Sequence, residues 1–135
     1  MSAFDGPSVH TGEAREALRR VAHAIGRVEN PAEIGPVLSE VSDGLVSLGQ
    51  ALHQAARLHD GGASRTAQVA GGQLAGRTAS YQVSWELHRA AEMVRQVAAS
   101  IDRAHEVEAT ITYDVRDFSS PAPAPHPTRE PGLSL

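Results

Sequence analysis

The sequence predicts an all-α protein, an elongated antiparallel three-helix bundle with coiled-coil-like seams and a disordered Pro-rich C-terminal tail. In three segments, apolar residues recur at alternating spacings of three and four, which is the pattern of one side of a helix. Aromatic residues make up only 4% of the chain, so aliphatic residues and Ala must form most of the core. Five prolines after residue 120 favour extended chain and prevent that segment from packing into a core.

Residues 1–11 show no periodicity and are expected to form a flexible N-terminal arm. The first helix is predicted over about 12–29, with Thr11 as its N-cap. Its apolar residues fall on one stripe: Ala14, Leu18, Val21, Ile25 and Val28.

Asn30-Pro31 marks the start of the second helix, predicted over about 31–59, because Asn caps helices well and Pro suits the first helical position. Asp60 and the two glycines after it end the helix. The predicted seam repeats as in a coiled coil and comprises Ile34, Leu38, Val41, Leu45, Leu48, Leu52, Ala55 and His59.

Residues 60–78 form a Gly-rich connection, for which a flexible loop and a short helical turn are the alternatives. It lacks the Lys of a phosphate-binding loop. The third helix is predicted over about 79–112. The ordered region is expected to end near Phe118, so the predicted bundle spans 12–118 and the tail 119–135. The seam of this helix comprises Val83, Leu87, Ala90, Val94, Val97, Ile101, Ala104, Glu108 and Ile111.

Composition excludes several classes of function. The formal net charge of −4 argues against a nucleic-acid partner, because duplex binding requires a basic surface. The absence of cysteine excludes thiolate catalysis, disulfides and Cys-based zinc sites. All 12 basic residues are Arg, which indicates a GC-rich genome such as those of actinobacteria. We expect no membrane span and no classical signal peptide, hence a cytoplasmic protein or one exported by another route.

The histidines do not make a convincing metal site in the sequence. His88 and Glu92 are one helical turn apart, as are Asp102 and His105, but the two pairs lie too far apart along one helix to share an ion. A second helix would have to supply ligands, and there the candidates are His53, His59, Glu40 and Asp43. No nucleophile elbow is present either. We therefore predict no enzyme, no metal and no cofactor.

A second face on the third helix points to a partner. Tyr81, Trp85 and His88 share a side roughly opposite Val83 and Leu87, so this helix should lie between two neighbours. Trp85 is either a packing residue or an exposed anchor. The predicted partner-binding residues are Tyr81, Trp85, His88, Leu87, Val94 and Ile101. The partner is a second copy or another helical protein, and the tail tip with Leu133 and Leu135 is a candidate docking peptide.

Tyr113 and Asp117 form a Tyr-x-x-x-Asp pattern after the third helix. Together with Trp85 near the start of that helix, this resembles the helical-hairpin substrates of type VII secretion, the Trp-x-Gly family, over roughly residues 30–117. The Trp-x-Gly motif itself is absent. The resemblance implies export without a signal peptide, pairing of two hairpins, and an export signal at Tyr113 and Asp117. Our leading hypothesis is a non-catalytic interaction or structural subunit that oligomerises through the third helix, and the type VII-like protein is the alternative.

Overall fold

The computed structural model describes residues 6–114 and 124–125, and all regular elements in these ranges are helical. In chain order they are α1 (Pro7–Ile25), the 3₁₀ turn η1 (Pro31–Glu33), α2 (Ile34–Asp60), α3 (Gly62–Thr66) and α4 (Gln73–Glu108). The predicted all-α class is confirmed. Among these helices, none combines the length and the apolar character that crossing a membrane requires.

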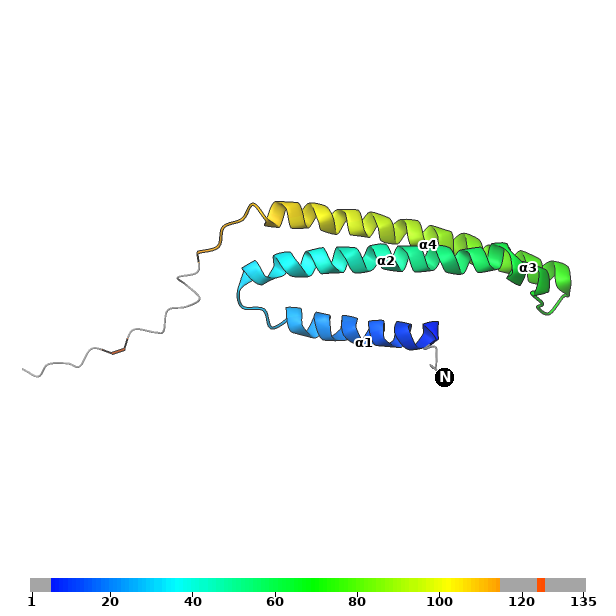
Figure 1. Ribbon diagram of the computed structural model, residues 1–135, viewed down its shortest axis with the longest axis horizontal. Helices are drawn as coiled ribbons and strands as arrows, with labels where there is room; N and C mark the ends of the chain where they lie inside the picture. Colours follow the sequence, from blue (N-terminus) through cyan, green and yellow to red (C-terminus); the bar gives the residue numbers. More distant parts are fainter. Residues whose placement is uncertain (1–5, 115–123, 126–135) are drawn as a thin grey trace, which may run out of the picture.

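Helices α2 and α4 run antiparallel, side by side, and pack against each other over most of their length (Figure 1). The short helix α3 lies at the end where the chain turns between them. Helix α1 folds back along the other side of α2, away from α4. Within the single chain, α2 is the long helical neighbour of α4, so α1 is not the second neighbour that was predicted for the third helix. The short connection at residues 26–30 holds α1 next to α2.

The first helix begins earlier than predicted. Pro7 occupies its first turn after Gly6, and the predicted cap Thr11 lies inside the helix, where its Oγ1 donates to the Ser8 carbonyl at 3.0 Å. Proline needs no amide partner at the first helical position, so Pro7 was the signal for this boundary. The Asn30 cap is confirmed, since its Oδ1 accepts a hydrogen bond from the Ala32 amide at 3.1 Å.

Much of the connection predicted at 60–78 is helical. Residues 62–66 form α3, and α4 already begins at Gln73, so the non-helical part is Gly61 and residues 67–72. Gly71 and Gly72 have φ angles of 120° and 94°, which favour glycine. Gly76 lies under this connection, and a Cβ there would stand 2.0 Å from the Ala67 carbonyl oxygen. Glycine at position 76 therefore lets the connection pack onto α4.

Small residues form the contact between α2 and α4, and we call this contact the seam. On α2 the buried residues recur every seventh position, and on α4 they follow a similar spacing from Ser84 onward. The seam comprises Gly35, Ser42, Gly49 and Ala56 on α2 and Gly76, Ser80, Ser84, Ala91 and Ala98 on α4. The predicted seams of Leu, Val and Ile are therefore wrong as the contact surface.

The helices approach closely along the seam because so little side chain separates them. A Cβ added to Gly49 would lie 3.7 Å from the Ala91 carbonyl oxygen, and Ser42 Oγ donates to the Ala98 carbonyl at 3.4 Å. The buried apolar residues of the described chain are Ala56, Ala91 and Ala98, and no large side chain in it is fully buried. The long aliphatic side chains are displaced to one side of the seam.

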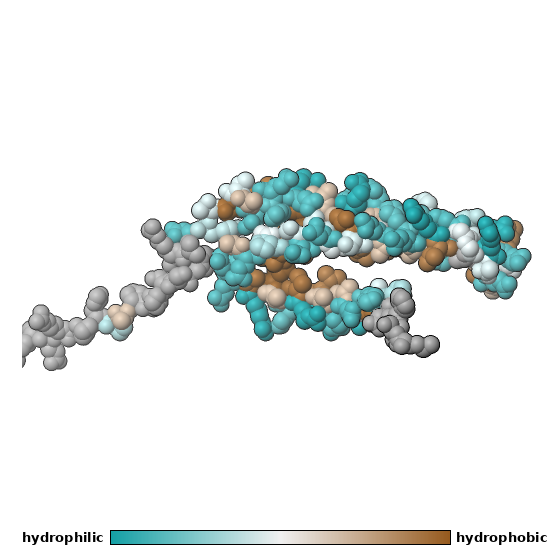
Figure 2. Space-filling view, viewed as in Figure 1, coloured by the Kyte–Doolittle hydropathy of each residue, from teal (hydrophilic) through white to brown (hydrophobic). Residues whose placement is uncertain are grey.

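Helix α1 buries none of its residues. Apolar residues gather between α1 and α2 in Figure 2, yet Leu18 remains 63% exposed and Ile25 42% exposed. This helix therefore covers α2 only loosely. Several predictions concern residues that the structure does not describe. These are the export residue Asp117, the docking tip with Leu133 and Leu135, and most of the predicted arm and tail.

The two glycines Gly76 and Gly44 provide a matched test of this packing. We expect Gly76→Ala to lower the free energy of unfolding by about 1–3 kcal/mol, because its methyl group meets backbone atoms of residues 67–68. Gly44→Ala has open space around it on α2 and should raise stability by about 0.5–1 kcal/mol. Urea unfolding followed by circular dichroism measures both, and equal stability of the two variants would contradict the packing.

Candidate functional site: the two faces of the α2–α4 hairpin

The α2–α4 hairpin carries its long aliphatic side chains on one face. On both helices these residues either precede a buried seam residue by one position or follow it by three, so they have the same rotational offset from the seam. Antiparallel helices are related by a two-fold axis perpendicular to the pair, and equal offsets therefore lie on the same side. We call this the apolar face: Leu38, Val41, Leu45, Leu48 and Leu52 of α2, and Val83, Leu87, Val94, Val97 and Ile101 of α4.

No residue of the apolar face is fully buried. Leu48 is 45% exposed, Val83 41% and Val97 50%, and the other members are half-buried. A shallow hollow of about 360 Å³ on α4 is lined by Val83, Leu87 and their neighbours Ala79, Gln82 and Glu86. Single exposed apolar residues are common on protein surfaces, but a continuous row along two paired helices indicates an interaction surface.

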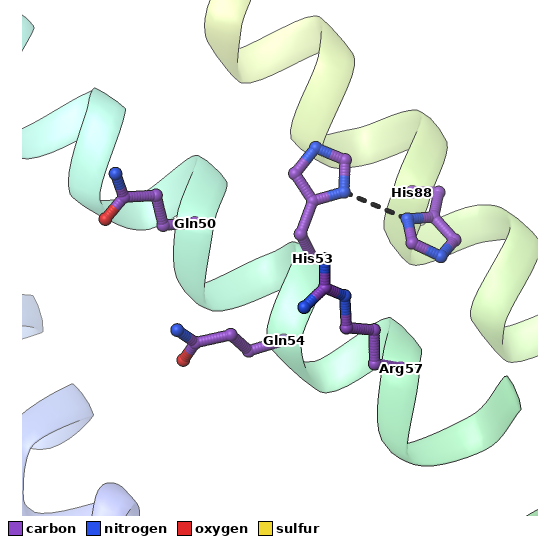
Figure 3. Close-up of a pocket in the computed structure, with 5 residues that line it drawn as sticks. All are labelled: Gln50, His53, Gln54, Arg57 and His88. Carbon is purple, nitrogen blue, oxygen red and sulfur yellow. Dashed lines mark hydrogen bonds between the residues drawn. The ribbon is translucent and has the colours of Figure 1, made fainter. Parts of the chain in front are cut away.

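The opposite side of the seam, which we call the polar face, carries a chain of hydrogen bonds between the helices. Ser84 Oγ donates to Asp60 Oδ1, and His88 Nε2 lies 3.1 Å from Asp60 Oδ2. His53 Nδ1 and His88 Nδ1 lie 2.9 Å apart (Figure 3). Since His88 donates through Nε2 to the carboxylate, its neutral form accepts at Nδ1, and His53 donates there.

Asp60 is held as a carboxylate by this chain. Its hydrogen bond from Ser84, and then that from His88, lower the pKa of Asp60 below its ordinary value. Ser84 is 2% exposed and donates to Asp60 instead of to a histidine. The group that accepts the Ser84 proton is thus a carboxylate of lowered pKa, which is a weaker base than the imidazole that usually activates a serine nucleophile.

Further along the polar face, Glu92 is fixed by its neighbours on α4. Hydrogen bonds from Arg95, then from Gln96, lower the pKa of Glu92 to about 2, and the charge of Arg95 acts in the same direction. The Arg95 Nη2 to Glu92 Oε1 distance is 2.6 Å. The Glu92 carboxylate is thus turned toward Arg95 on its own helix.

The aromatic residues of α4 also lie on the polar side. Tyr81 is 50% exposed and Trp85 is 59% exposed, with the Arg89 guanidinium 5.5 Å from the Trp85 ring centroid. Beside them, a hollow of about 420 Å³ is lined by Gln50, His53, Gln54, Arg57 and His88 (Figure 3). Trp85 is therefore a surface residue in the single chain, and the packing alternative fails there.

The structure divides the six predicted partner-binding residues into two groups. Leu87, Val94 and Ile101 belong to the apolar face, whereas Tyr81, Trp85 and His88 lie across the seam from them. Sequence reasoning missed Ser84 and the pairing of His53 and Asp60 with His88. The seven-residue recurrence of Gly35, Ser42, Gly49 and Ala56 was the signal that identifies the contact side of α2 and hence its flanks.

Tyr113, the predicted export residue that the structure describes, lies just beyond α4 and is half-buried. Burial raises the pKa of the Tyr113 hydroxyl above its ordinary value, and the hydrogen bond with Glu108 adds to the effect. Tyr113 therefore folds back onto the last turn of α4.

Comparison with known proteins finds no matching family, no similar curated protein and no similar solved structure. The chemistry of the apolar face and the polar face therefore carries the functional proposal.

Proposed function

We propose that this chain is a non-catalytic helical interaction subunit that pairs with a second copy of itself through the apolar face of the α2–α4 hairpin. The observation that carries the proposal is the row of partly buried aliphatic side chains on both helices, in which Leu48, Val83 and Val97 are each more than 40% exposed. Fully burying a Leu, Ile or Val side chain contributes about 1.5–3 kcal/mol, and this face leaves much of that contribution unused.

The extent of the apolar face suits a dimer interface. It runs from Leu38 to Leu52 on α2 and from Val83 to Ile101 on α4, which corresponds to about 20–27 Å of helix at 1.5 Å per residue. A standard interface takes about 800 Å² from each partner.

A second copy fits this face better than α1 does. Helix α1 lies beyond α2 and does not reach α4, and it is shorter than either hairpin helix. In contrast, another hairpin brings two helices of matching length with the same seven-residue repeat. An isologous two-fold interface requires such self-complementarity, and four helices would then enclose the aliphatic residues.

Two variants distinguish the apolar face from the aromatic surface. Val97→Glu should weaken self-association at least about tenfold, because the interface would bury an unpaired carboxylate. Trp85→Ala, on the other side of the seam, should leave association unchanged. Sedimentation equilibrium over a range of concentrations measures both, with circular dichroism as the check that helicity is preserved. A wild-type chain that stays monomeric throughout, or dissociation by Trp85→Ala alone, would contradict the proposal.

The second candidate is the type VII-like secreted hairpin protein. It is supported by the antiparallel pairing of α2 with α4 and by the position of Tyr113 directly after α4. Under this hypothesis, deleting residues 113–135 should abolish export from the native host and leave the helical circular dichroism spectrum unchanged. Undiminished export of the truncated chain would exclude the candidate.

A further inference from the structure

One pattern of the sequence has no role in the proposed interface, namely His88 and Glu92 one turn apart on α4. That pair lacked a ligand from a second helix. The structure brings His53 of α2 opposite His88, with the two Nδ1 atoms 2.9 Å apart and the ring centroids 5.2 Å apart. Two imidazole nitrogens from neighbouring helices therefore meet at one point on the polar face.

The spacing of the two nitrogens fits a metal chelate. A metal–imidazole bond is about 2.0–2.1 Å long, so two nitrogens 2.9 Å apart subtend an angle of about 90° at a shared ion. This is the angle between neighbouring ligands in the tetragonal sites that Cu²⁺ and Ni²⁺ prefer. Both rings reach solvent, so they can turn until their lone pairs converge.

The surroundings of His88 resemble the support that metal-binding histidines have. Asp60 Oδ2 accepts from His88 Nε2 at 3.1 Å, which leaves a lone pair on His88 Nδ1, and Ser84 in turn holds Asp60. In the structure His53 Nδ1 donates to this lone pair, so an ion binds both nitrogens when His53 takes its other neutral tautomer, with the proton on Nε2. A carboxylate in this position fixes the tautomer of a ligating histidine and raises its basicity. The hollow beside the pair is lined also by Gln50, Gln54 and Arg57, and it has room for a hydrated ion. The exposed Arg57 side chain must turn its guanidinium toward solvent when a cation binds.

We propose that His53 and His88 bind a divalent late transition-metal ion, with Cu²⁺ as the best fit, and that Asp60 supports the site from behind. The described residues contain no group of three or more candidate ligands, and the Glu92 carboxylate is held by Arg95. Water therefore completes the coordination. Because one ligand comes from α2 and one from α4, the ion ties the two helices together near the turn end of the hairpin.

Calorimetric titration of the untagged full-length chain with Cu²⁺, and separately with Ni²⁺, tests this site. We expect one ion per chain at the site, and His53→Gln and His88→Gln should each weaken its binding at least about tenfold. Asp60→Asn should weaken it less than the loss of either ligand. His10→Gln removes an exposed histidine of α1 and should leave the affinity unchanged.

Thermal unfolding gives a second readout. Cu²⁺ should raise the melting temperature of the wild-type chain and of His10→Gln, because the ion binds the folded state, and should not raise that of the double variant His53→Gln/His88→Gln. Wild-type-like binding by both single variants, or no binding by the wild-type chain, would overturn the proposal. Circular dichroism of each variant verifies that the helices are intact.

Discussion

The close contact between α2 and α4 determines the rest of this structure. Gly, Ser and Ala occupy the seam at intervals of seven residues on α2 and of four and then seven on α4. The two backbones therefore approach until a Cβ at Gly49 would touch the Ala91 carbonyl. Dispersion and van der Waals contact between backbones replace the interdigitated Leu side chains of an ordinary bundle. Ser42 and Ser84 satisfy their hydroxyl groups across the same contact.

The two faces of the hairpin follow from this contact. A seam of small residues cannot accommodate long side chains, so the aliphatic residues lie on one flank. His53, His88, Asp60 and the aromatic residues lie on the other. The first flank is the surface on which we propose self-association, and the second holds the proposed His53–His88 metal site. Loose attachment of α1, which buries no residue, leaves both flanks of α4 accessible.

The sequence predicted the helices better than their packing. Periodicity identified the helical segments, and the Asn30-Pro31 signal identified one boundary, because both depend on local chemistry. The contact side was mistaken because Leu45 and Val94 dominate any hydrophobic pattern, whereas Gly49 and Ala91 contribute almost nothing to it. The histidine pair could not be found because His53 and His88 are brought together by the register of the two helices, which the sequence pattern did not specify.

The unfolding free energy of the Ala56→Leu variant tests the small-residue contact most directly. Ala56 is 0% exposed in the seam, whereas the aliphatic pattern of the sequence places it beside the core. A seam of small residues predicts a loss of about 1–3 kcal/mol, because a larger side chain forces the helices apart. An unchanged or increased stability at equal protein concentration would contradict the account, since it would mean that α2 and α4 meet through their aliphatic residues.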